Sequence, residues 1–151
     1  MDIAVIVQKI QYVLAPAVMI SSAALLLSGY QNKFSSLSSR FRALNQEKRL
    51  LSQEPQRSRI EEARLENILH QMHNILKRAT YAKNAIVLTY LAIICFTGTS
   101  VLIFINLYTV RIDYWIIGVF LAGLVLILLS AVLMMIETAI LYRVIMLEKK
   151  V

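Results

Sequence analysis

Two apolar stretches in the C-terminal half decide the fold of this chain. Residues 85–107 are AIVLTYLAIICFTGTSVLIFINL, and residues 114–136 are YWIIGVFLAGLVLILLSAVLMMI. Each has 23 residues and no charge, which suffices for a helix to cross a hydrocarbon core of about 30 Å. Only residues 108–113 separate them, and Tyr114 and Trp115 flank this short outer turn as aromatic anchors at a membrane surface. These stretches predict two membrane-spanning helices.

A third apolar stretch, residues 13–30, lies near the N-terminus. Gln8 and Lys9 interrupt the apolar residues before it, so residues 1–12 are predicted to form an amphipathic segment at the outer interface. Pro16 then suits the first turn of a new helix, where its missing N–H costs nothing. The alternative is one long helix that is kinked at Pro16.

The composition agrees with a membrane protein of a single domain. Hydrophobic residues make up 58% of the 151 residues, against about 45–50% in soluble domains. The single cysteine, Cys95, cannot form an intramolecular disulfide. The chain begins Met1-Asp2, with no basic residue before its first apolar residues, and Lys9 comes late, so a retained span is expected rather than a cleaved signal peptide.

The positive charge is concentrated in one region. Of the 16 lysines and arginines, 11 lie between Lys33 and Lys83. The positive-inside rule accounts for this distribution without a nucleic-acid partner. Residues 31–84 and the C-terminal helix or tail, residues 137–151, are therefore expected in the cytoplasm, with the N-terminus outside.

Residues 31–84, called the hairpin below, are predicted to form two antiparallel helical arms. The region has no glycine, and its one proline, Pro55, marks a turn near residues 52–57. Apolar residues recur at heptad-like spacing on both arms. They are Phe34, Leu37, Phe41, Leu44 and Leu51, with Lys48 in one position, and then Leu65, Ile68, Met72, Ile75 and Ala79. Further apolar residues off this line, Ile60, Leu69 and Leu76, suggest contact with other subunits or with a partner.

No catalytic motif is present, so we expect no enzyme and no cofactor. Glu66, His70 and His73 share one helical face at i, i+4 and i+7. Such a group is a weak candidate for a metal site. The more economical interpretation is a solvated face with a pH-sensitive charge, and we expect no metal.

Glu137 directly follows the apolar run that ends at Ile136. Ionisable residues at such a depth pair with other charges or line a polar path. Lys83 or Arg78, which enter the second span from the same side, are the expected partners. An interfacial salt bridge is favoured over an ion or proton site.

The first span carries small residues along one face, called the stripe below. They are Ala17, Ser21, Ala24 and Ser28, with Asn32 and Lys33 following at the cytoplasmic mouth. Small residues let helix backbones approach closely. Packing is the favoured interpretation, and a pore lining formed by several copies is the alternative.

Several blocks of the sequence resemble a known bacterial family. They are Ile6 to Gln8, Leu14 to Ser21, Leu25 to Leu27 with Asn32 and Lys33, Arg40 to Arg42, Leu76 to Arg78 with Ala85 and Ile86, and Ser130 with Glu137. The chain is similar over nearly its whole length to the membrane family known as domain of unknown function 2721. The resemblance implies three spans in a bacterial inner membrane and supplies no activity.

These observations leave two functions of different classes in competition. The first is a homo-oligomeric membrane protein that forms an ion channel or pore with the first span near the axis. The alternative is a non-conducting structural or accessory protein whose hairpin docks a protein partner. An enzyme or proton-coupled transporter that uses Glu137 ranks last, because three short spans leave little room for a substrate cavity.

Overall fold

The computed structural model describes residues 3–53, 59–108 and 113–148, and all of them are helical. They form α1 (Ile3–Gln53), α2 (Arg59–Tyr108) and α3 (Asp113–Glu148). Each of the three helices is long and apolar enough to cross a membrane. The prediction of an all-helical chain with three such helices is confirmed. The expected turn near residues 52–57 and most of the turn at 108–113 lie outside the described residues.

The helices are much longer than a membrane is thick. With 51 and 50 residues, α1 and α2 are each about 75 Å long at 1.5 Å per residue. A hydrocarbon core measures only about 30 Å. Both helices therefore continue without a break from their apolar part into the polar hairpin.

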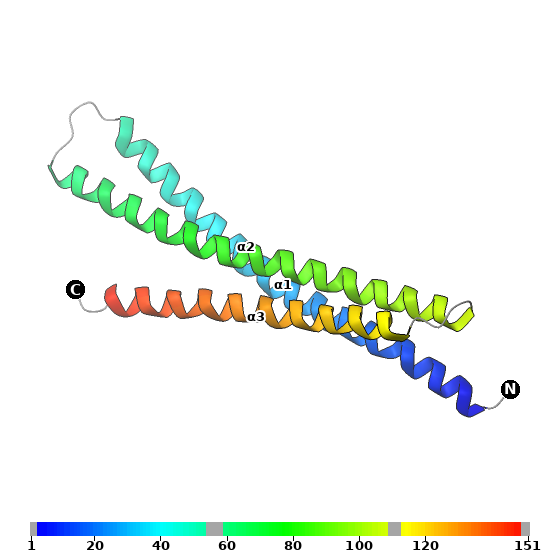
Figure 1. The fold of residues 1–151 in the computed structure, drawn as a ribbon. Helices are drawn as coiled ribbons and strands as arrows, with labels where there is room; N and C mark the ends of the chain where they lie inside the picture. The colour runs from blue at the N-terminus through cyan, green and yellow to red at the C-terminus, as the bar shows by residue number, and fades with distance from the viewer. Residues whose placement is uncertain (1–2, 54–58, 109–112, 149–151) are drawn as a thin grey trace.

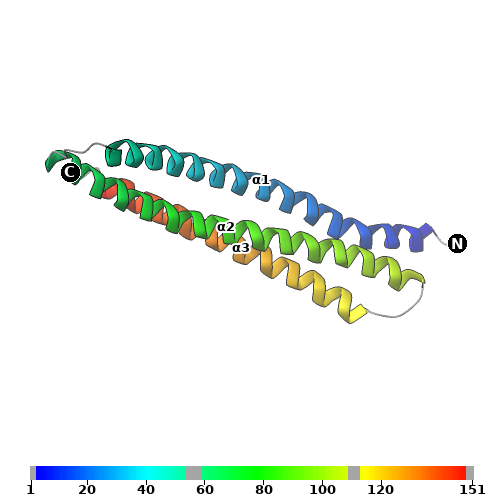
Figure 2. The same ribbon diagram turned by 90° about the horizontal axis from the view of Figure 1, so that it is seen from above.

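The N-terminal segment differs from the separate interfacial helix that was one of the two expectations. Helix α1 runs continuously through Pro16. A proline removes a single backbone hydrogen bond and bends a helix without ending it. Figure 2 shows the N-terminal end of α1 running at an angle to the rest of the helix. Residues 3–12 thus extend the first apolar helix.

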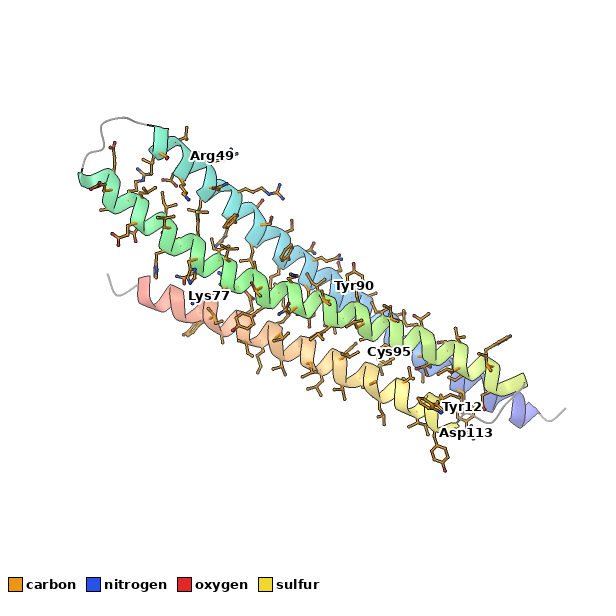
Figure 3. All side chains as sticks on the ribbon, turned by 45° about the horizontal axis from the view of Figure 1, so that its top comes forward. Tyr12, Arg49, Lys77, Tyr90, Cys95 and Asp113 are labelled. Carbon is orange, nitrogen blue, oxygen red and sulfur yellow. The ribbon has the colours of Figure 1, made fainter. Side chains whose placement is uncertain are left out.

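Helix α2 lies between the other two helices. It packs along most of α1 and along α3, whereas α1 and α3 touch each other very little. Figures 1 and 2 show α2 running back along α1, and α3 running back along α2. Figure 3 accordingly places Tyr12 of α1 and Asp113 of α3 at the same end of the molecule.

Buried positions recur at steps of three, four or seven residues along most of each helix, as expected where long helices pack side by side. In α1 they step by seven, at Pro16, Ala23, Tyr30 and Leu37. In the apolar part of α2 they are small residues, with Phe96 and Ile103 as the large members. They are Ala82, Ala85, Thr89, Ala92, Phe96, Thr99 and Ile103. This line of buried residues, the α2 seam, lets both neighbours approach α2 closely.

The hairpin arms pack through most of the heptad-spaced residues. Leu37 and Ile68 are buried, and the others are half-buried apart from Phe34, which is exposed. At the far end of the hairpin, Arg64 Nη2 lies 2.6 Å from Glu47 Oε1. Phe34 is 36% exposed and lies about 40–60° around α1 from Tyr30 and Leu37, so it stands at the edge of the packed face.

The tightest fit between α2 and α3 is at Gly123. A Cβ atom on Gly123 would lie 2.7 Å from Cε1 of Phe96. The Phe96 side chain is fully buried, and its ring also contacts Phe120 with centroids 5.6 Å apart. Gly123 is therefore the notch in α3 that receives Phe96, the largest side chain of the α2 seam.

Gly123→Ala should weaken the packing of α2 against α3. We expect the free energy of unfolding to fall by about 1–3 kcal/mol, because overpacking displaces a buried ring. Reversible unfolding of the purified protein in mixed micelles measures the change. Gly118→Ala is the matched control, since a Cβ at Gly118 meets nothing within 4 Å. Equal effects of the two substitutions would refute the notch.

Candidate functional site

One charged side chain from each helix meets in a single cluster. Glu137 of α3 accepts hydrogen bonds from Arg78 of α2 at Oε1, at 3.0 Å from Nε and 2.8 Å from Nη2. Its other oxygen, Oε2, accepts one from Lys33 Nζ of α1 at 2.7 Å. Lys33 Nζ also donates to Thr138 Oγ1 at 2.6 Å. These residues form the ionic cluster.

The burial of these groups explains why two cations surround one acid. The Glu137 side chain is fully buried, the Arg78 side chain is 11% exposed, and the Lys33 side chain is 37% exposed. A buried carboxylate is costly unless its oxygens are paired and hydrogen-bonded. Both oxygens of Glu137 are satisfied here, and the cluster keeps one excess positive charge. That charge is nearest to solvent at Lys33.

An apolar layer lies directly against the cluster. Tyr30 and Leu37 of α1, Ala82 and Ala85 of α2, and Met134 of α3 form one buried group. Tyr30 and Met134 are each three residues from a member of the ionic cluster, which is about one helical turn. The cluster therefore sits at the end of the apolar part of the three helices.

Of the two cations expected near Glu137, the structure brings in Arg78 and leaves Lys83 exposed. Five residues correspond to about 140° around a helix. Lys83 therefore points away from the side of α2 that Arg78 occupies.

Lys33 joins the cluster although its sequence position suggested the cytoplasmic mouth of the stripe. It lies five residues beyond Ser28 and is about 150° around α1 from the centre of the stripe. The sequence could have indicated that Lys33 faces inward, because it lies midway between Tyr30 and Leu37. These two residues mark the inward side of α1.

The stripe residues lie on the outer surface of the chain. Ala17, Ser21, Ala24 and Ser28 are all exposed, as is Asn32. Ser21 Oγ donates to the carbonyl oxygen of Ala17 at 3.2 Å. The stripe is about 140° around α1 from the buried line at Pro16, Ala23, Tyr30 and Leu37, so it does not pack within this chain.

The histidine face carries no assembled metal site in the described part of the chain. Glu66, His70 and His73 are all exposed on α2. Among the described residues, no three side chains of His, Cys, Asp or Glu lie close enough together to hold a metal ion. Cys95 is half-buried with a free thiol.

Comparison with known proteins identifies a family and no characterised relative. A family model described as "Protein of unknown function (DUF2721)" matches residues 13–147. No curated protein and no solved structure matches the chain.

The ionic cluster should contribute strongly to stability. We expect Glu137→Gln to lower the free energy of unfolding by about 3–5 kcal/mol, because it leaves the buried Arg78 charge without its partner. Reversible unfolding in mixed micelles measures the change. Glu47→Gln is the control, since it removes a carboxylate from the exposed pair with Arg64 and should cost less than about 1 kcal/mol.

The double variant Arg78→Met, Glu137→Leu tests the cause of the loss. It removes both buried charges and should recover much of the stability that Glu137→Gln loses. A Glu137→Gln variant as stable as the Glu47→Gln variant would show that the cluster contributes little.

Proposed function

The chain belongs to the DUF2721 family, whose function is unknown, and we propose that it is a homo-oligomeric, non-enzymatic protein of the bacterial inner membrane. In this proposal the stripe on α1 forms the interface between copies. The hairpin and the C-terminus lie in the cytoplasm and the N-terminus lies outside. The Lys and Arg distribution supports this orientation, with 11 of 16 in the hairpin.

The depth of the chain in the membrane follows from its aromatic anchors. Tyr114 and Trp115, at the start of α3, are 92% and 71% exposed and suit the outer interface. About 20 residues cross the hydrocarbon core, which brings the inner boundary close to Met134. Because Met134 packs with Tyr30 and Ala82, all three helices reach that boundary at the same level.

The observation that carries the proposal is the contrast between the exposed faces of the helices. Helix α3 presents large aliphatic side chains to its surroundings. They are Ile117, Leu121, Val125, Leu128, Leu129, Val132, Met135 and Ile136. Helix α1 also exposes large side chains, at Leu14, Val18 and Leu25, but it aligns the four exposed small residues of the stripe along one face. A lipid-facing surface needs no small residues, whereas helix–helix contacts in membranes are enriched in them.

The details of the stripe favour close packing over a water-filled pore. The exposed hydroxyl group of Ser21 donates to the carbonyl oxygen of Ala17 on its own helix. It therefore needs no water and fits a dry interface. Lys33 bonds to Glu137 and Thr138 rather than extending along the stripe. A pore along α1 is the conducting form of the same assembly, with Asn32 at its inner mouth.

A second candidate function rests on the surface of the hairpin. Leu50, Leu69 and Leu76 are 69%, 45% and 52% exposed, and they lie beyond the apolar part of the helices. Contiguous apolar patches rimmed by polar residues mark sites of protein contact, and Leu69 and Leu76, seven residues apart, share one face of α2. An accessory role would use them to dock a soluble partner while the spans act as the anchor.

Substitution of the stripe should dissociate the oligomer. The variant Ala17→Leu, Ala24→Leu places bulk where close approach is needed, so we expect a shift to monomer in lipid nanodiscs, measured by mass photometry. The control Ala122→Leu, Ala131→Leu makes the same change at exposed positions of α3 and should leave the wild-type mass. A monomeric wild-type protein would refute the proposal.

Ion flux in proteoliposomes distinguishes the assembly from its conducting form. Flux above that of empty liposomes, lost in the stripe variant and kept in the α3 control, would establish a pore. An oligomer without flux would leave the structural role. The accessory function would be favoured if substitution of Leu50, Leu69 and Leu76 by serine abolished binding of a soluble partner without changing the oligomer mass.

A further inference from the structure

The charges of the hairpin separate into two zones along its length. The tip, residues 47–66, holds five cations and five acids, so its net charge is zero. The stem, residues 31–46 and 67–84, holds six cations and no acid. They are Lys33, Arg40, Arg42, Lys77, Arg78 and Lys83. Figure 3 shows this order, with Arg49 near the tip and Lys77 closer to the middle of the molecule.

Most of the stem charge has no acid to balance it. Glu137 of α3 reaches only Lys33 and Arg78. The remaining four cations, Arg40, Arg42, Lys77 and Lys83, are exposed, and none forms an ion pair with another residue that the structure describes. In the tip, by contrast, Arg64 is paired with Glu47.

The unpaired cations extend from the level of the lipid headgroups to about a Debye length beyond it. Lys33 and Lys83 flank the apolar layer that marks the end of the spans. Lys77 is five residues beyond Ala82, or about 8 Å, and Arg40 and Arg42 are ten and twelve residues beyond Tyr30, or about 15 Å and 18 Å along their helix. The headgroup layer is about 5–7 Å thick, and lysine and arginine side chains extend along a helix to reach it.

We propose that the stem is a docking surface for the phosphate groups of anionic phospholipids in the adjoining leaflet. Arg40, Arg42, Lys77 and Lys83 supply the positive charge, and the ionic cluster adds one more at Lys33. Charge complementarity with an anionic leaflet acts over about 8–10 Å at physiological salt. The stem is continuous with the apolar parts of α1 and α2, so the lipids that it would bind already lie next to the protein. The neutral tip lies beyond this range.

Full-length protein in phosphatidylcholine vesicles tests the proposal. Spin-labelled phosphatidylglycerol and phosphatidylcholine with the same acyl chains compete for the protein surface, and electron paramagnetic resonance measures their relative association. We expect wild-type protein to favour phosphatidylglycerol by about fivefold at low salt. The preference should shrink in about 1 M salt, where the screening length is about 3 Å.

Matched variants show which residues cause the preference for phosphatidylglycerol. The stem variant Arg40→Gln, Arg42→Gln, Lys77→Gln, Lys83→Gln should lose it. The tip variant Lys48→Gln, Arg49→Gln, Arg59→Gln, Arg64→Gln removes the same charge and should keep it. A conservative variant, Arg40→Lys, Arg42→Lys, Lys77→Arg, Lys83→Arg, retains the charge and should also keep it, which controls for folding.

Three results would overturn the proposal. They are an unchanged preference in the stem variant, an equal loss in the tip variant, and loss of the preference when phosphate replaces chloride at the same ionic strength. The last result would assign the surface to free phosphate. The oligomer mass of each variant is measured separately, so the failure of the stripe interface and the failure of lipid docking give different results.

Discussion

The carboxylate of Glu137 binds one cation from each of the other two helices, and the arrangement of the chain depends on this contact. Helices α1 and α3 touch each other very little, so their relation is set mainly through α2. The bond from Lys33 to Glu137 is a direct link between them, and the bonds from Arg78 connect the same group to α2. Because the carboxylate is fully buried, a shift of any one helix would expose or unpair a charge. Such a shift carries a far larger penalty than a slide between apolar surfaces.

The α2 seam makes this ionic contact possible. Alanines and threonines let the neighbouring backbones approach closely, and Thr89 satisfies its own hydroxyl by donating to the carbonyl of Ala85 at 2.9 Å. The seam therefore adds no unsatisfied polar group to the apolar part of the structure. Phe96 is its largest member, and Gly123 provides the space for it. Close packing along α2 and the ionic cluster at its end together fix both the distance and the longitudinal position of the helices.

The sequence predicts the three helices well, but it is a poor guide to which side of each helix faces inward. Three apolar stretches and a glycine-free hairpin are enough to predict three long helices, because length and periodicity are local properties. The partners of Glu137 depend on which side of each helix faces inward. Lys33 and Lys83 are both near the right depth, yet only Lys33 lies on the inward side. Small residues were likewise recognised on α1, where this chain leaves them exposed, and overlooked on α2, where they are buried. The fit of Phe96 into Gly123 joins residues on two helices and has no local signal.

The two surfaces that the chain leaves open differ in depth and chemistry, so the two proposals are compatible. The stripe lies within the apolar part of α1 and faces about 140° away from its contact with α2. A second copy can therefore pack on it without displacing α2. The stem cations begin where the stripe ends, and in the lipid-docking proposal an anionic lipid would neutralise charge that would otherwise repel a neighbouring copy. Close approach of two stripes brings two positive stems near each other, and this repulsion is reduced when phosphate groups lie between them. Lipid docking at the stem would then favour association through the stripe.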